Sequence, residues 1–143
     1  MAYEFISNDT ENEFYPLDKS EIAQAEDELE LNFPQPLKDF YSDIGYGFLK
    51  SSNSNVNRLM DPESVRDFRL RRNDFEFFPD IEIYDEYEEN KLIFFEVSES
   101  ALMSIGTTDN NIYYYDIPIA ASLEEFLLKM MENDRYYFEL LED

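Results

Sequence analysis

The chain has 143 residues and a formal net charge of −23, from 34 acidic and 11 basic side chains. It contains no Cys, His or Trp, which excludes disulfides, thiol or imidazole metal ligation and a Ser-His-Asp catalytic relay. The length fits one domain, residues 1–143, and a hydrophobic content of 43% is too high for a disordered chain.

The charge also narrows the classes of partner. An acidic chain repels phosphate backbones and anionic lipid surfaces, so we expect no direct binding to nucleic acid or to a membrane. Basic protein partners are favoured because complementary charge speeds encounter. The alternative is that the charge only keeps a cytoplasmic protein in solution. No apolar run reaches about 18 residues and the first residues lack a basic signal region, so we expect a cytoplasmic location.

The N-terminal third predicts an arm followed by a helix. Residues 1–16 are polar and acidic with scattered rings, which predicts an arm that packs a few rings on the body or, alternatively, a flexible tail. Asp18 and Glu21 have the spacing of a capping box. Apolar residues at helical spacing follow, so we expect a helix over residues 19–30.

A proline corner comes next. Pro34 and Pro36 end the first helix, and Pro36 suits the first position of a second one. Gly45 is placed to act as its left-handed cap, and Gly47 permits a further tight bend. Four apolar residues at helical spacing are expected to face the sheet: Leu37, Phe40, Tyr41 and Ile44.

The middle of the chain begins with a polar stretch, Ser51 to Asn57, which predicts a loop. Asp61, Pro62 and Glu63 then predict the start of a short helix with apolar residues turned inward. Five of the 11 basic residues cluster around it: Arg58, Arg66, Arg69, Arg71 and Arg72. We expect these arginines to neutralise neighbouring acids; an anion-binding site is the alternative.

Residues 74–90 have the most uneven charge of any stretch, with eight acids, no basic residue and many interleaved rings. A solvated loop does not need so many rings, so we expect partial order, with some rings buried and the acids projecting outward. Aromatic residues are common binding anchors, so this segment is the candidate partner surface; the alternative is a solvated acidic loop covering the sheet edge. The candidate partner-binding residues are Asp74, Glu76, Asp80, Glu82, Tyr84, Asp85, Glu86, Tyr87, Glu88 and Glu89. Their spacing is not that of an EF-hand loop, so we expect no metal and no cofactor.

The last third predicts strands and a helix. Three β-rich runs predict strands over 92–97, 101–105 and 112–116, the last two joined by a hairpin turn at Asp109-Asn110-Asn111. Ser122 predicts the cap of a final helix with an apolar face from Leu123 to Met131, and this helix can extend as far as Leu141. The elements together predict an acidic α+β domain that binds a partner and has no catalytic residues.

Several stretches resemble the SUKH superfamily, which includes the yeast Smi/Knr cell-wall-assembly regulators. They are, in chain order, IAQAEDELEL, FPQPLKDFYSDIGYGFL, LMSIGTTDNNIYYYD and PIAASLEEFLLKM. This chain departs from the family at Gly45-Tyr46-Gly47, where a Gly-Gly pair is common, and at an Asn-rich hairpin turn. Residues 51–90 match no family motif.

The resemblance implies an antiparallel sheet flanked by helices and no enzymatic activity. Bacterial members are commonly cytoplasmic immunity proteins that neutralise a cognate toxin, often a nuclease, of a polymorphic toxin system. Eukaryotic members act as regulators or scaffolds. The hypotheses are therefore an immunity protein that binds a basic toxin and, alternatively, an intracellular regulatory scaffold of the same fold; the oligomeric state stays open.

Overall fold

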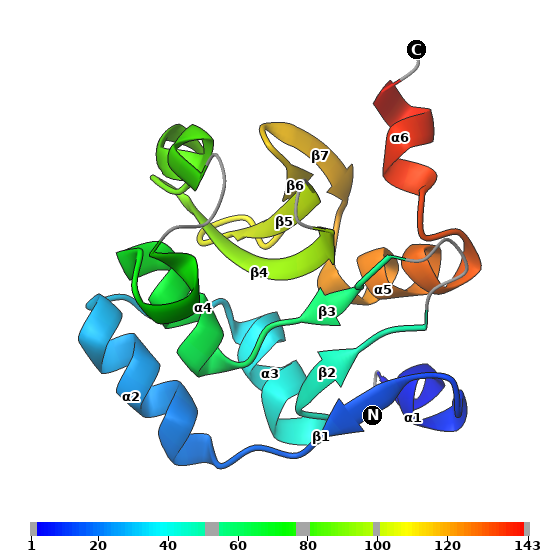
Figure 1. The fold of residues 1–143 in the computed structure, drawn as a ribbon. Coiled ribbons are helices and arrows are strands. Elements are labelled where there is room, and N and C mark those ends of the chain that lie inside the picture. Colours follow the sequence, from blue (N-terminus) through cyan, green and yellow to red (C-terminus); the bar gives the residue numbers. More distant parts are fainter. Residues whose placement is uncertain (1–2, 51–54, 77–80, 99–100, 142–143) are drawn as a thin grey trace.

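The computed structural model describes residues 3–50, 55–76, 81–98 and 101–141 (Figure 1). Within these ranges, seven strands form one antiparallel sheet whose spatial order is the chain order, and helices flank it. The strands are β1 (Glu13–Tyr15), β2 (Tyr46–Phe48), β3 (Arg58–Leu59), β4 (Lys91–Ser98), β5 (Ala101–Gly106), β6 (Ile112–Tyr114) and β7 (Ile117–Ala120). The predicted fold class, an antiparallel sheet with flanking helices, is confirmed.

Six α-helices and two 3-10 helices accompany the sheet in the described ranges. The α-helices are α1 (Glu4–Asn8), α2 (Lys19–Leu29), α3 (Gln35–Asp43), α4 (Pro62–Leu70), α5 (Leu123–Glu132) and α6 (Tyr136–Leu141). The 3-10 helices are η1 (Asn73–Phe75) and η2 (Ile81–Tyr87). Across the same ranges, every helix is too short or too polar to cross a lipid bilayer.

Helix α2 begins with the predicted capping box. The Asp18 carboxylate accepts from the Ser20 backbone N–H at 3.0 Å, and the Glu21 carboxylate accepts from the Asp18 backbone N–H at 3.2 Å. Two backbone donors that the first helical turn leaves free are therefore satisfied.

Helix α3 turns its apolar face to the interior as predicted, although it begins one residue earlier, at Gln35. Leu37 and Phe40 are fully buried, and the buried Tyr41 hydroxyl donates to the Met60 carbonyl at 2.6 Å. Ile44, at the C-cap, is only half-buried.

Two glycines after α3 let the N-terminal arm join the sheet. Gly45 has φ +116° and Gly47 has φ +150°, conformations that side chains rarely adopt. A Cβ at either position would collide with a backbone carbonyl of the arm, at Tyr15 or Glu13. The glycines therefore permit the close pairing of β1 with β2. The rings of Tyr3 and Phe14 complete the contact by packing edge-on against Phe40.

The core lies around β4 and β5, which are buried over almost their whole length. Helix α5 covers this part of the sheet, because the Phe126 ring meets Phe94 and Phe95 at centroid distances of 6.1 and 5.1 Å. The Ser122 side chain accepts from the Glu125 backbone N–H at 3.1 Å, so the predicted cap of this helix is confirmed.

The predicted extension of the final helix to Leu141 is wrong. Helix α5 ends at Glu132, and Asn133 is extended, with φ −156° and ψ 100°. The Asn133 side chain accepts from the Arg135 backbone N–H at 3.1 Å, a local bond that competes with helix continuation. Asp134 is almost fully buried and accepts from the Asn57 side chain at 3.0 Å, which fixes the break.

The predicted strand over 112–116 ends early. Strand β6 stops at Tyr114, and Tyr115 and Asp116 form a two-residue connection to β7, where Tyr114 pairs with Ile117. Strands β1, β2, β3 and β7 were not predicted. They hold three, three, two and four residues and owe their hydrogen bonds to neighbouring strands.

Candidate functional site

Arg66 of α4 and Arg71, the residue that follows this helix, form ion pairs with neighbouring acids. The Arg66 guanidinium lies 2.7 Å from the Glu28 carboxylate of α2 and 2.9 Å from Asp67. Arg71 lies 2.6 Å from Asp85 and 2.8 Å from Glu88. The prediction that these arginines neutralise neighbouring acids is confirmed for both residues.

Arg71 connects residues 74–90, which we call the acidic segment, to α4. It is the C-cap residue of that helix, with φ +57°, and its guanidinium donates to the Phe68 carbonyl at 2.6 Å. The same guanidinium lies 5.1 Å from the centroid of the Phe68 ring. One side chain therefore joins a helix end, an aromatic ring and two carboxylates of the segment.

Glu88 corrects one expectation. Acids of the segment were predicted to project outward, but Glu88 is only 8% exposed because it lies against Arg71, with Arg69 at 3.9 Å. Burial raises the pKa of Glu88, and the charges of Arg71 and Arg69 oppose that rise. In the free protein, Glu88 belongs to the anchor of the segment.

Aromatic rings form the other support. Tyr84 is buried; its ring meets Phe68 edge-on at 5.8 Å and stacks on Tyr115 at 5.6 Å. The Tyr87 ring lies 5.4 Å from Tyr115. Burial raises the pKa of Tyr84, as does the neighbouring Tyr115 to a lesser extent. Partial order with some buried rings is confirmed, and Phe75 is a further buried ring.

The candidate residues therefore separate into groups. Four acids are exposed: Glu76, Glu82, Asp85 and Glu89. Tyr87 is half-buried, and Tyr84 and Glu88 are buried. Asp80 lies outside the described residues, as do the side chains of Asp74 and Glu86.

The exposed part of η2 borders an open groove of about 470 Å³, which we call the η2 groove. It is lined by Glu82, Ile83, Asp85, Tyr87 and Tyr115. Figure 1 shows the reason for this lining: η2 lies at the top of the view beside the β6–β7 hairpin, which brings Tyr115 to the segment.

Sequence reasoning missed two lining residues of the η2 groove, Ile83 and Tyr115. Ile83 was among the interleaved apolar residues, and its 44% exposure is the unexpected feature. Tyr115 was assigned to a strand. Its place in a two-residue turn follows from the pairing of β6 with β7, which was not predicted.

A second acidic groove lies on α2. Its volume is about 440 Å³, and among the residues that the structure describes no aromatic residue lines it. We call it the α2 groove; its lining residues are Ala23, Glu26, Asp27, Glu30, Leu31 and Asn32. One of its carboxylates has a structural role, because Glu26 accepts from the Phe33 backbone N–H at 2.7 Å and pairs with Lys38 at 3.4 Å.

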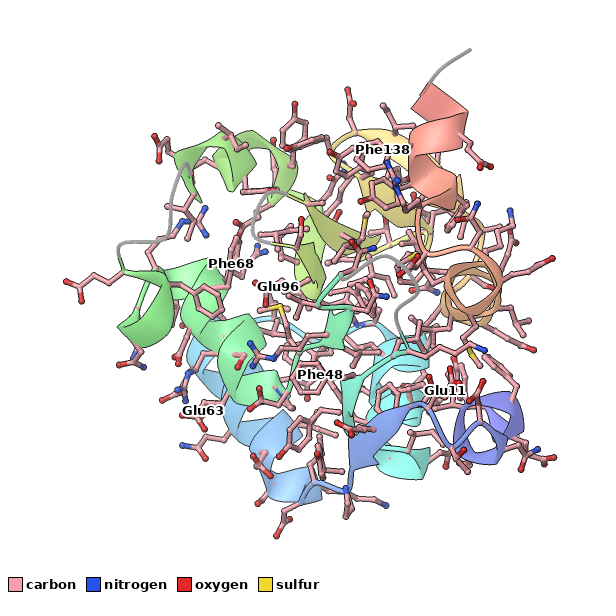
Figure 2. All side chains as sticks on the ribbon, turned by 45° about the vertical axis from the view of Figure 1, so that its right-hand side comes forward. Glu11, Phe48, Glu63, Phe68, Glu96 and Phe138 are labelled. Atoms are coloured by element: carbon pink, nitrogen blue, oxygen red, sulfur yellow. The ribbon has the colours of Figure 1, made fainter. Side chains whose placement is uncertain are left out.

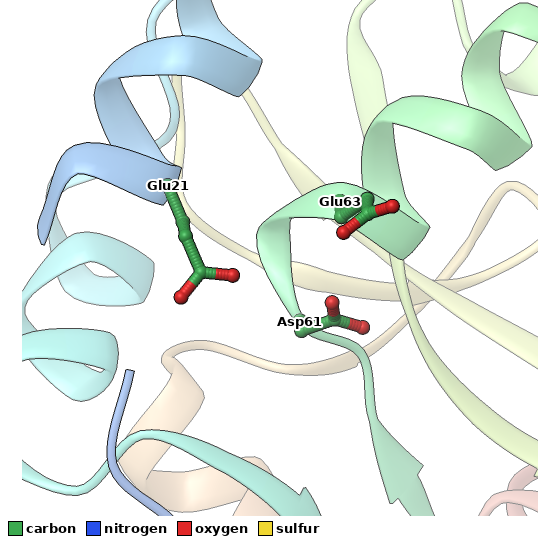
Figure 3. Close-up of side chains that lie close together, drawn as sticks. All are labelled: Glu21, Asp61 and Glu63. Carbon is green, nitrogen blue, oxygen red and sulfur yellow. The ribbon is translucent and has the colours of Figure 1, made fainter. Parts of the chain in front are cut away.

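Three carboxylates also converge between α2 and the start of α4 (Figure 3). Oxygen atoms of Glu21, Asp61 and Glu63 lie within 4.8 Å of one another. Each has a protein partner: Glu21 caps α2, Asp61 lies 3.2 Å from Arg58, and Glu63 lies 3.6 Å from Arg66. Capping and ion pairing account for this cluster.

The antiparallel meander and the helices that flank it define a small α+β protein. The family described as SMI1-KNR4 cell-wall (SUKH_6) matches residues 19–127. The chain belongs to this SUKH family, which confirms the resemblance found in the sequence.

A close relative is the immunity protein YxxD of Bacillus subtilis (strain 168). It is 62% identical over 146 residues, an alignment that covers 100% of this chain and 99% of the relative.

Proposed function

We propose that this chain is a cytoplasmic, non-enzymatic immunity protein that binds and neutralises a cognate toxin of a bacterial polymorphic toxin system. The observation that carries the proposal is the 62% identity, over the whole chain, to a relative named as an immunity protein. Its membership of the SUKH family fits this role.

We further propose that the toxin is a basic nuclease domain and that the acidic segment contacts it. The support is electrostatic. A nuclease must be basic where it holds phosphate, and this chain has a net charge of −23. The exposed carboxylates of Glu76, Glu82, Asp85 and Glu89 can occupy such a surface and compete with the nucleic acid. Asp74, Asp80 and Glu86 add charge to the same stretch.

Co-expression tests the proposed function. We expect this chain to restore growth of cells that express the toxin domain encoded beside it, and the two purified proteins to form a stable complex. A toxin domain with an inactivated catalytic residue is the control for expression, because it should leave growth unaffected and still bind. No rescue and no complex would contradict the proposal and favour the regulatory scaffold.

A further inference from the structure

We propose that the η2 groove is the binding site for a single arginine side chain of the partner protein. The inference deepens the proposed function, since it names the chemistry by which the acidic segment recognises the toxin. Two observations support the inference: the acidic groove complements a cationic side chain, and the residues that line the groove suit an arginine.

The groove offers three kinds of contact to an arginine side chain. Tyr87 and Tyr115 supply ring faces on which a planar guanidinium can stack. Ile83, 44% exposed, supplies an apolar contact for the methylene stem. Glu82 and Asp85 supply carboxylates at the rim, where Glu82 has no basic partner among the residues that the structure describes.

The molecule already holds one of its own arginines in this way. The Arg71 guanidinium lies over the Phe68 ring at 5.1 Å and pairs with Asp85 at 2.6 Å. Asp85 has a 69% exposed side chain, so its remaining acceptor sites face solvent beside the groove. A second guanidinium can therefore bind the opposite side of a carboxylate that Arg71 already orients.

Tyr115 is held in an uncommon conformation at this site. Its φ is +58°, at the first position of a two-residue hairpin connection where glycine or asparagine is usual. Stacking on Tyr84 at 5.6 Å and contact with Tyr114 at 4.6 Å fix its ring. A bulky ring kept where glycine would be less strained indicates that the ring itself is used.

The α2 groove provides a built-in comparison. It has similar volume and exposed acids but no ring among its described lining residues, so a cation there gains attraction without stacking. An arginine probe should therefore distinguish the two grooves.

The first experiment titrates isotope-labelled protein with N-acetyl-arginine methylamide and follows the amide resonances. We expect saturable shifts at Ile83, Tyr87 and Tyr115, and at least tenfold weaker effects with the neutral citrulline analogue. Equal shifts at Asp27 and Glu30 would overturn the proposal, as would no saturable shift at the η2 groove.

The second experiment measures affinity for the toxin domain. Tyr115→Leu and Glu82→Gln should each weaken binding about tenfold, whereas Asp27→Asn in the α2 groove should leave it unchanged. Glu82 is exposed, so its variant is informative even if Tyr115→Leu folds poorly.

The two experiments separate the two proposals. Tight binding by wild type that neither groove variant alters would overturn the arginine site and leave the immunity function standing. If the toxin does not bind at all, the proposed function fails, and the arginine titration still decides the groove.

Discussion

The two acidic grooves differ in how they are supported, although their volumes are close, about 440 Å³ on α2 and 470 Å³ at η2. The α2 groove lies on a capped α-helix, whose backbone supplies its own hydrogen bonds. The η2 groove is built on a 3-10 helix of seven residues, longer than is usual for that geometry. An element of this kind needs outside support, and here Arg71 and the Phe68 ring provide it.

The acids of the α2 groove therefore solvate a helix face, whereas the acids of the η2 groove lie on a segment that is held against a specific surface. Charge is present at both grooves, so charge alone does not distinguish them. Of the two grooves, only the η2 groove has rings fixed by packing among its described lining residues.

The largest effect is expected from Phe68→Ala. Phe68 is fully buried, and its ring meets Phe75 and Tyr84 edge-on at 5.1 and 5.8 Å. Its loss should lower the free energy of unfolding by about 3–5 kcal/mol, measured by denaturant titration. Phe48→Ala is the matched control, because Phe48 is 40% exposed (both residues are labelled in Figure 2). Equal losses for the two variants would contradict the role of Phe68 as the support of η1 and η2.

The fold was predictable where its signals are local. The capping box of α2, the proline corner and the Asn-rich hairpin turn are each encoded within a few residues, and each is confirmed. Strand β3 could not be predicted in this way. Its two residues, Arg58 and Leu59, carry no periodicity and become a strand only through β2 and β4.

The same limit applies to the site. The richness of residues 74–90 in acids and rings was visible in the sequence. The burial of Glu88 was not visible in the sequence, because it depends on Arg69 of α4 and on Arg71, the residue after that helix. The place of Tyr115 depends on the β6–β7 hairpin reaching η2. Contacts between distant segments decided which residues of a charged stretch line a groove.

Removing the cation that supports η2 should have the next largest effect. Arg71→Ala leaves the buried Glu88 without its nearest cation and removes the bond to the Phe68 carbonyl. The free energy of unfolding should fall by about 2–4 kcal/mol. Lys38→Ala, which removes the half-exposed partner of Glu26 beside the α2 groove, should cost at most about 1 kcal/mol. Similar costs would show that both grooves are supported alike.

A smaller effect, of defined sign, is expected from Glu88→Gln. Burial raises the folded-state pKa of Glu88 above its ordinary value of 4.5, while Arg71 and Arg69 favour the charged form and Asp85 disfavours it. The native state therefore binds this proton more readily than the unfolded chain does. The resulting contribution to stability is present below the pKa of Glu88 in the unfolded chain. It is lost as pH rises through the pKa of Glu88 in the folded protein.

The measurement is the difference in free energy of unfolding, wild type minus Glu88→Gln, as a function of pH. This difference should decrease as pH rises above about 4.5. The subtraction removes the opposite contributions of exposed acids such as Asp109, whose pKa is lowered by the Tyr113 hydroxyl. A difference that is flat or rises with pH would contradict the raised pKa.

The smallest expected effect concerns the rate of encounter with the toxin domain. Charge reversal at Glu82, Asp85, Glu86 and Glu89 should weaken binding, mostly through the association rate and most visibly at low salt. The cleanest version is the double variant Glu82→Lys with Glu89→Lys, because it leaves the Arg71–Asp85 pair intact. Its association rate should fall about tenfold at low salt, and the difference should shrink as salt is added.

The control for this last prediction is Asp27→Lys with Glu30→Lys, which changes the net charge by the same amount on the α2 groove. Helix α4 lies between α2 and η2 (Figure 1), so the control places its new charges away from the proposed interface. Because steering weakens with distance from the contact surface, the control should slow association less than the η2 variant does. Equal slowing by both variants would mean that total charge, and not the acids beside the η2 groove, directs the toxin to this protein.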